Sequence, residues 1–309
     1  MIPIPRTEVY TWRGYRCSYQ VYSGSVETPP LLLIHPLGVG LAGWFWERFC
    51  QAWYGQGQQN PIYNPDLLGC GQSDQPVAAY TPQDWADQLA DFIHQVIQRP
   101  VVVVAQGATL PIALKLLLLP KMQGWVRGLV LSGPPGWRLI TTATPAWRQR
   151  LLWNLLFSGP VGWGLFRYVR RDQFLRSFSR RQLFGREADI DQGWIDSLGQ
   201  DAQGERGRYA VYSFLAGFWR EDYGAAISQL TLPTLVLFGA GASGIDRLSK
   251  TDSAHQRLQA YLTHLPQAQG EIMTGRNVLP YESTAEFVMY VSQWIELVLD
   301  DRKEPVVKD

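Results

Sequence analysis

Short apolar runs alternate with segments of helical periodicity along most of this 309-residue chain. Leu31–Ile34 and Val101–Val104 are apolar at every position, which is typical of parallel strands buried on both faces. The pattern predicts further strands at 61–66, 128–132 and 234–238, and helices at 44–54, 81–96 and 254–265. Strands and helices that alternate in this way predict a mostly parallel sheet wrapped by helices, an α/β fold.

Residues 137–222 interrupt the alternation. They lie between two predicted strands and are rich in Trp, Phe and Arg. This composition predicts a helical cap inserted into one domain, whose core is formed by 1–136 and 223–299. The mostly charged tail at 300–309 is expected to be frayed.

Composition narrows the function classes. A formal net charge of +1 argues against whole-surface attraction to nucleic acid. The three scattered cysteines form no Cys-x-x-Cys pair, so neither a zinc site nor a disulfide framework is indicated. No signal peptide, long apolar span, phosphate loop or dinucleotide fingerprint is recognisable. We therefore expect a cytoplasmic protein with no cofactor and no metal.

Besides the strand–turn–helix at 101–114, four segments carry recognisable motifs. They are His35-Pro36-Leu37-Gly38, the Asp-x-x-Gly-x-Gly-x-Ser-Asp turn at 66–74, the strand 233–239, and the loop 275–282. With the strand–turn–helix at 101–114, they make residues 31–297 resemble the α/β-hydrolase superfamily. The resemblance implies an α/β-hydrolase fold with a helical cap. The stretches 64–71 and 275–284 are similar to uncharacterised hydrolase-like proteins of cyanobacteria and plastids.

The chain departs from that superfamily at the three positions that the resemblance assigns to catalysis. Gly107 stands at the nucleophile position of the turn, which reads Ala-Gln-Gly-Ala-Thr in place of Gly-x-Ser-x-Gly. Ala242 stands at the position of the acid, and Val278 at that of the histidine. A serine–histidine–acid triad works as a unit, so ordinary acyl transfer is not expected. Glycine at 107 keeps the turn, because it reaches strained φ/ψ values without steric cost.

The surroundings of the turn could still polarise a ligand. The resemblance implies an oxyanion-like pocket formed by His35, Leu37, Gln106, Gly107 and Ala108. Its hydrogen-bond donors would be the backbone N–H of Ala108 and a backbone N–H at or near Leu37. Pro36 replaces the usual glycine of that loop and restricts it. His35 borders the pocket and could act on a bound water, although a histidine here normally braces the loop.

Other candidate groups are weaker. Ser132 could be a displaced nucleophile, and Asp246 could stand in for the acid, but a strand-end hydroxyl and a solvated loop carboxylate are the simpler interpretations. Cys70 lies in a glycine-flanked turn where no nearby group would lower its pKa. His94, His255 and His264 are expected to be packed or surface residues.

The cap combines arginine with aromatic residues. Between Pro145 and Arg186 the only acidic residue is Asp172 and no lysine occurs. Four interpretations stay open: arginines that are solvated or ion-paired, a lid over an apolar ligand, a protein interface, and a contact with an acidic membrane surface. The candidate contact residues are Trp163, Arg167, Arg170 and Arg171.

These observations lead to three functional hypotheses. The first is a catalytically degenerate protein that binds a hydrophobic small molecule or a protein partner through its capped pocket. The second is a hydrolase that acts on ester-type substrates with a non-standard site. The third is a peripheral membrane or complex-assembly factor. Fold likeness alone does not decide among them.

Overall fold

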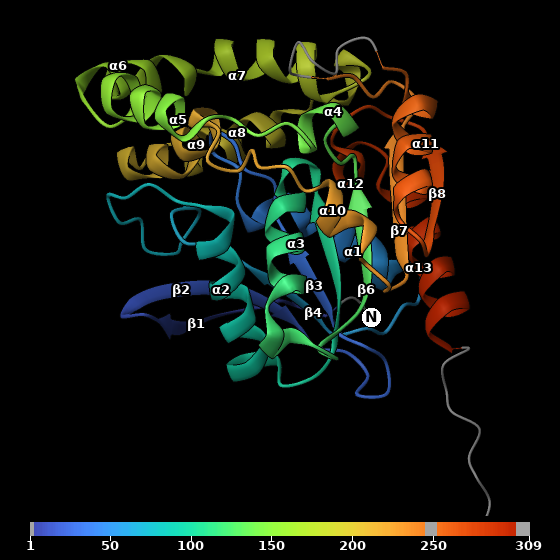
Figure 1. Cartoon of the computed structure of the whole chain (residues 1–309). Coiled ribbons are helices and arrows are strands. Elements are labelled where there is room, and N and C mark those ends of the chain that lie inside the picture. The colour runs from blue at the N-terminus through green and yellow to red at the C-terminus, as the bar shows by residue number, and fades with distance from the viewer. Residues whose placement is uncertain (1–2, 245–251, 301–309) are drawn as a thin grey trace, which may run out of the picture.

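Eight strands form one sheet in the order β1-β2-β4-β3-β5-β6-β7-β8 (Figure 1). The computed structural model of the protein describes residues 3–244 and 252–300. β1 and β2 pair antiparallel and β2 is antiparallel to β4, whereas the strands from β4 to β8 are parallel. The strands are β1 (Arg6–Trp12), β2 (Tyr15–Tyr22), β3 (Leu31–Ile34), β4 (Ile62–Pro65), β5 (Val101–Gln106), β6 (Val126–Ser132), β7 (Thr234–Gly239) and β8 (Ala268–Met273).

The apolar runs are the central strands of this sheet. Every residue of β3, β5 and β7 is buried, as the sequence pattern predicts for strands covered on both faces. The predicted strands at 61–66, 128–132 and 234–238 are β4, β6 and β7 within two residues. The mostly parallel α/β architecture is thereby confirmed.

Helices cover both faces of the sheet. One face packs against α2 (Pro82–Phe92), α3 (Leu110–Leu118) and α11 (Ala254–His264), and the other against α1 (Glu47–Gly55) and α13 (Thr284–Asp300). Thr81 is the N-cap of α2: the Asp84 N–H donates to Thr81 Oγ1, and the Thr81 N–H donates to the Asp84 side chain. The predicted helices at 44–54 and 254–265 correspond to α1 and α11.

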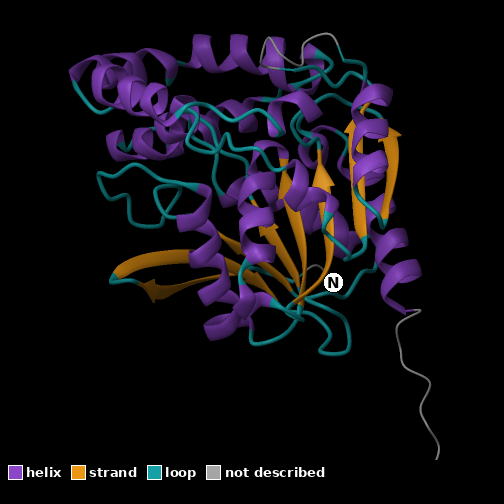
Figure 2. Cartoon of the chain, viewed as in Figure 1, coloured by secondary structure: helices purple, strands orange, loops and turns teal. Residues whose placement is uncertain are grey.

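Between β6 and β7 every described element is helical. The cap elements are α4 (Trp137–Ile140), α5 (Ala146–Leu152), α6 (Pro160–Val169), α7 (Asp172–Phe178), α8 (Gln192–Asp201) and α9 (Arg208–Ala216), joined by short 3-10 and π turns. α10 (Gly224–Ser228) follows before β7. The arrows of the parallel strands point toward these helices (Figure 2), so the cap lies over the carboxyl end of the sheet.

Each helix within residues 3–244 and 252–300 is too short or too polar for a bilayer crossing. Residues 301–309 of the predicted tail and the candidate Asp246 lie outside the described residues.

Candidate functional site

The turn after β5 is built around Gly107. Its φ of +62° lies in the left-handed region, which glycine adopts without the Cβ clash of other residues. A 3-10 turn, Gly107–Thr109, leads directly into α3. A Cβ placed on Gly107 would meet no heavy atom closer than the Gly133 carbonyl oxygen, at 4.0 Å. The strand–helix turn therefore has its tight geometry and room for a Cβ, but it presents no side chain.

Hydrogen bonds bring the three predicted positions to one place. Gln106 Nε2 donates to the Asn277 carbonyl oxygen at 2.7 Å, and Asn277 Nδ2 donates to the Ser243 carbonyl oxygen at 3.1 Å. Gln106, Asn277 and Ser243 are the chain neighbours of Gly107, Val278 and Ala242. The turn after β5 and the loops after β7 and β8 thus meet at the carboxyl edge of the sheet.

A segment of the cap, Gln182–Gly185, is fastened to this edge; we call it the cap strap. The Asn277 backbone N–H donates to the Leu183 carbonyl at 3.0 Å, and Asn277 Nδ2 donates to the Gln182 carbonyl at 2.6 Å. The Gly185 N–H donates to Glu282 Oε1 at 2.6 Å. The strap is therefore bonded to the loop that carries Val278, a position that is itself buried.

Arg276 reinforces the same junction. Its Nη2 and Nε donate to Ser243 Oγ at 2.6 and 3.0 Å. Its Nη1 donates to the Phe184 carbonyl of the cap strap at 3.4 Å. The guanidinium thereby joins the loop after β7 to the cap.

His35 is a structural residue. It is fully buried, its Nδ1 lies 3.0 Å from the Pro36 carbonyl oxygen, and its Nε2 accepts from the Leu67 N–H at 3.1 Å. Burial lowers the pKa of His35, more than the nearby Asp66 raises it. The prediction that His35 borders the pocket and could act on water is wrong, because both ring nitrogens are engaged inside the protein. The bracing role is the one observed.

The other three histidines are packed or exposed, as expected. His94 makes an edge contact with Trp125, His264 stacks on Trp137, and His255 is exposed on α11. None of these ring contacts reaches Gln106, Gly107 or Asn277.

Two further candidates are buried. Ser132 has no exposed surface, lies in register with Gln106, and its Oγ has no hydrogen-bond partner among the described residues. Burial raises the pKa of the Cys70 thiol, and Asp66 and Asp201 add to the shift, so this cysteine is held as an unreactive thiol. Cys17, Cys50 and Cys70 are all buried and free.

The predicted oxyanion-like loop lies beneath the cap. Leu37 and Ala108 are both half-buried. Further along the loop, Gly40 has a φ of +71°, and a Cβ built there would lie 2.0 Å from the Leu198 carbonyl oxygen of α8. Only glycine permits so close an approach of the cap backbone.

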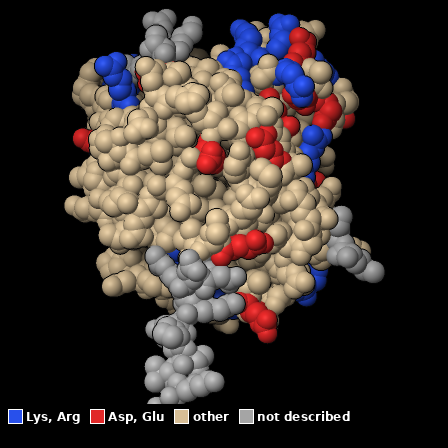
Figure 3. Space-filling view, turned by 90° about the vertical axis from the view of Figure 1, so that its right-hand side faces the viewer, with Lys and Arg blue, Asp and Glu red and all other residues tan. Residues whose placement is uncertain are grey.

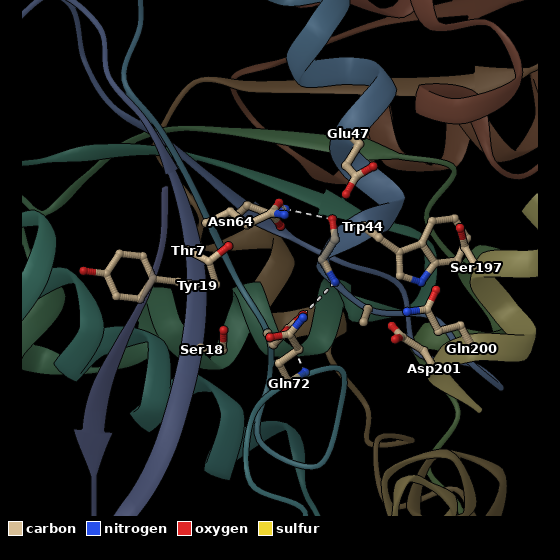
Figure 4. Close-up of a pocket in the computed structure, with 14 residues that line it drawn as sticks. Thr7, Ser18, Tyr19, Trp44, Glu47, Asn64, Gln72, Ser197, Gln200 and Asp201 are labelled. Atoms are coloured by element: carbon tan, nitrogen blue, oxygen red, sulfur yellow. Dashed lines mark hydrogen bonds between the residues drawn. The ribbon is translucent and has the colours of Figure 1, made fainter. Parts of the chain in front are cut away.

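A polar cleft of about 300 Å³ lies beside this loop, and Figure 4 shows it. Gly107, Ala242 and Val278 do not line it. Its walls come from β1, β2, the segment 42–47, the end of β4, Gln72 and α8. Sequence reasoning missed this cleft, although Asp66 of the predicted turn is one of its residues. Asp66 accepts from the Gly43 N–H at 2.8 Å and from the Gln72 N–H at 2.9 Å.

The cleft is acidic. Glu47, Asp66 and Asp201 line it, and no basic residue does. Burial raises the pKa of Asp201 to about 6, and the negative charges of Asp66 and Glu47 contribute to the same shift. A second, more open hollow of about 690 Å³ lies between Arg170, Asp172 and α8.

The cap arginines have mixed surroundings. Arg186 pairs with Asp189 and Arg180 with Glu187, as the ion-paired interpretation predicts. Asp191 is instead paired with Arg48 of α1. Figure 3 shows basic side chains gathered at the cap end of one face, with acidic ones among them.

The residues predicted to contact a ligand, partner or membrane already make contacts within the cap. Arg170 Nη1 donates to the Gln203 carbonyl at 3.0 Å, and Trp163 Nε1 donates to Glu205 at 2.9 Å. Arg167 lies 4.7 Å from the centroid of the Trp163 ring, and Arg171 lies 5.6 Å from that of Tyr168. Arg170 and Trp163 thus have a structural use within the cap.

Comparison with known proteins agrees with this fold. The profile of the alpha/beta hydrolase family matches residues 31–289, and the chain belongs to that family. The sequence matches no curated protein.

Solved structures with this fold include several enzymes. A serine hydrolase involved in carbazole degradation aligns with a TM-score of 0.72 at 18% identity, over 95% of this chain and 100% of that one. A thermophilic esterase from Thermogutta terrifontis aligns with a TM-score of 0.69 at 16% identity, over 96% and 99%. The epoxide hydrolase CorEH aligns with a TM-score of 0.70 at 15% identity, over 95% and 99%. Identities this low establish the fold alone.

Proposed function

We propose that this chain is a non-hydrolytic member of the alpha/beta hydrolase family, which binds a hydrophobic small molecule or a protein partner through its cap. The observation that carries the proposal is Gly107. The tight turn after β5 is where the family holds its nucleophile, and this residue has no side chain that could attack a carbonyl.

The surroundings of Gly107 support the same conclusion. The loop that would hold the histidine carries the buried Val278, and both ring nitrogens of His35 are already engaged. A triad acts as a unit, and its loss lowers kcat by about 10⁶ in a well-studied serine protease. With neither a nucleophile at position 107 nor a base at position 278, these positions supply at most the polarising effect of backbone donors.

The fastened cap supports a binding role as well. The cap strap is held by hydrogen bonds from Asn277 and by Glu282, so the cap is bonded to the loop that carries Val278. A Cβ at Gly107 would meet no heavy atom closer than 4.0 Å, so the turn can accept a small apolar group beside it.

The experiment combines turnover with binding. Purified protein is incubated with p-nitrophenyl esters of graded acyl length, and the same esters are added in a thermal unfolding assay. We expect no protein-dependent product, together with a rise in Tm for the esters that bind, because a ligand bound only to the folded state stabilises it. Hydrolysis at a rate that follows the protein through purification would contradict the proposal.

A matched pair of variants decides whether any signal comes from the turn. Gly107→Trp fills the free space, and Gly124→Trp places the same side chain at another left-handed glycine that has no heavy atom within 4 Å of its Cβ position. Loss of the Tm rise in the first variant alone is expected. Equal loss of the Tm rise in both variants would show that the loss comes from backbone strain and not from the position of the side chain.

A hydrolase with a different nucleophile is the second candidate. The structures named above are enzymes, and Ser132 has a buried hydroxyl without a partner next to the Gln106 strand end. If ester turnover is found, Ser132→Ala abolishes it under this hypothesis. Turnover that survives both Ser132→Ala and Gly107→Trp would exclude this edge of the sheet as its source.

A further inference from the structure

Apolar side chains are exposed on one part of the cap far more than elsewhere. We define the cap tip as residues 146–171, which contain α5, the π-helical turn Trp153–Phe157 and α6. Eight of the seventeen large hydrophobic residues that are exposed in the described chain lie in it. They are Trp147, Leu151, Leu155, Leu156, Val161, Trp163, Leu165 and Tyr168.

These side chains follow the helix period. Trp147, Leu151 and Leu155 are four residues apart, and Val161, Leu165 and Tyr168 are spaced by four and three. Trp147, Leu155 and Val161 are 68, 64 and 59% exposed, and α5 contains no buried residue. Each helix therefore turns an apolar stripe to solvent.

The inner side of the tip is held separately. Phe157 and Phe166 are buried against Tyr212 of α9, which also donates a hydrogen bond to the Gly162 carbonyl at 2.7 Å. The tip is thus attached to α9 through its inner side, and of the outward stripes Tyr168 makes an edge contact with Phe174 of α7. Figure 1 shows α5 and α6 together at one corner of the molecule, away from the sheet.

The charge of the tip has a single sign. Its five charged residues are all arginine: Arg148, Arg150, Arg167, Arg170 and Arg171. Within the described chain no salt bridge joins any of the five to an acidic side chain. Arg148 and Arg150 are exposed on the same helix as Trp147 and Leu151.

We propose that the cap tip docks the protein on an anionic lipid surface, with its leucines and aromatic rings in the interface and its arginines on the lipid headgroups. Helices with one apolar and one cationic face lie in the plane of such surfaces. Trp and Tyr favour the boundary between headgroups and acyl chains, and each nearby arginine gains from the negative surface potential. The proposal does not depend on whether the Gly107 turn binds or reacts.

The test is cosedimentation of the full-length protein with phosphatidylcholine vesicles that contain or lack phosphatidylglycerol. We expect binding to the anionic vesicles only, weakened by added salt. Arg148→Gln with Arg150→Gln should lower the affinity for anionic vesicles roughly thirtyfold, at about 1 kcal/mol per arginine. Leu151→Ser with Leu155→Ser should lower it about tenfold.

Matched controls lie away from the tip. Leu118→Ser with Leu297→Ser removes two leucines that are 49 and 68% exposed on α3 and α13, and Arg127→Gln with Arg138→Gln removes two exposed arginines. These variants should bind like the wild type. Circular dichroism shows that each variant is folded.

Three results would overturn the proposal. The first is the absence of binding to anionic vesicles by a folded wild-type protein. The second is binding that the control pairs weaken as much as the tip pairs do. The third is a concentration-dependent dimer, measured by analytical ultracentrifugation, that the tip variants dissolve while vesicle binding is absent. That last result would assign the tip to a second copy of the chain.

Discussion

The two ends of the cap are built in opposite ways. At the attached end, the cap strap is hydrogen-bonded to the loop 275–282, and α8 approaches Gly40 more closely than any side chain would allow. At the cap tip, by contrast, apolar side chains face solvent and the arginines lack acidic partners within the described chain. The attached end therefore carries contacts that hold the cap, whereas the tip carries the surface that we propose for lipid docking, and each can be altered separately.

The largest effect is expected at the close approach under α8. Gly40→Ala should destabilise the protein by more than about 3 kcal/mol, since the new Cβ would lie 2.0 Å from the Leu198 carbonyl oxygen and the backbone is left-handed. Urea unfolding measures the loss. Gly124→Ala is the control, because Gly124 has a left-handed φ but no neighbour within 4 Å. It should cost only about 1 kcal/mol, and equal losses would refute a tight attachment.

The second-largest loss of stability is expected when the hydrogen bonds of the cap strap are removed. Asn277→Ala removes the donor to the Gln182 and Ser243 carbonyls and should cost about 2 kcal/mol, because both part-buried acceptors lose their partner. The change in the free energy of unfolding is measured from the shift in the urea midpoint, provided that the slope of that free energy against urea concentration is unchanged. Asn154→Ala, at an exposed position of the cap tip, should be close to neutral. A neutral Asn277→Ala would show that the strap is not held by these bonds.

The cleft beside α8 adds a pH-dependent effect. The pKa of Asp201 is raised to about 6 in the folded protein, so folding is disfavoured by its ionisation. This penalty is absent below the ordinary pKa of about 4 and fully present above pH 6. Asp201→Asn should therefore stabilise the protein at pH 7.5, by roughly 1 kcal/mol after solvent screening, and have little effect at pH 4.

Thermal unfolding of wild type and variant at the two pH values measures this difference. Asp196→Asn, which removes an exposed carboxylate from the same helix, is the matched control. A stabilisation by Asp201→Asn that is equal at pH 4 and pH 7.5 would exclude a raised pKa as its cause.

The smallest effect is expected at the tip. Leu151→Ser and Leu155→Ser should each change the free energy of unfolding by less than about 0.5 kcal/mol, because both side chains are already exposed. The midpoint of urea unfolding checks this. A loss of 2 kcal/mol or more, the scale of a buried leucine, would mean that the stripes pack against the cap.

Much of the core could be predicted from the sequence because its strands are unusually apolar. β3 and β5 are buried at every position. The capping box at Thr81 and Asp84 marks the start of α2. The ribbon of β1 and β2 and the edge strand β8 were not predicted. β1 and β8 (Ala268–Met273) alternate largely between exposed and part-buried positions. β2 is mostly buried, but Arg16, Ser18 and Gln20 interrupt its apolar residues, so no continuous apolar run marks any of these strands.

The position of the candidate site could be predicted from the sequence, but the hydrogen bonds that build it could not. Gly107, Ala242 and Val278 are found by counting along motifs, and the structure brings their chain neighbours together. The role of Asn277 depends on a cap residue 95 positions earlier in the chain, and no local pattern records such a contact. His35 was predicted to border an open pocket, because a sequence does not show which hydrogen bonds a ring makes.

The bonds made by Asn277 also set an order of events during synthesis. Gln106 lies 171 residues before Asn277, and Gln182 lies 95 residues before it, so neither residue can form its hydrogen bond until Asn277 has left the ribosome. Contacts of such long sequence separation form late, because the loop between them must close first. A nascent chain that ends before residue 277 therefore carries a complete cap whose strap has no anchor at Asn277. The cell must tolerate this intermediate each time the protein is made.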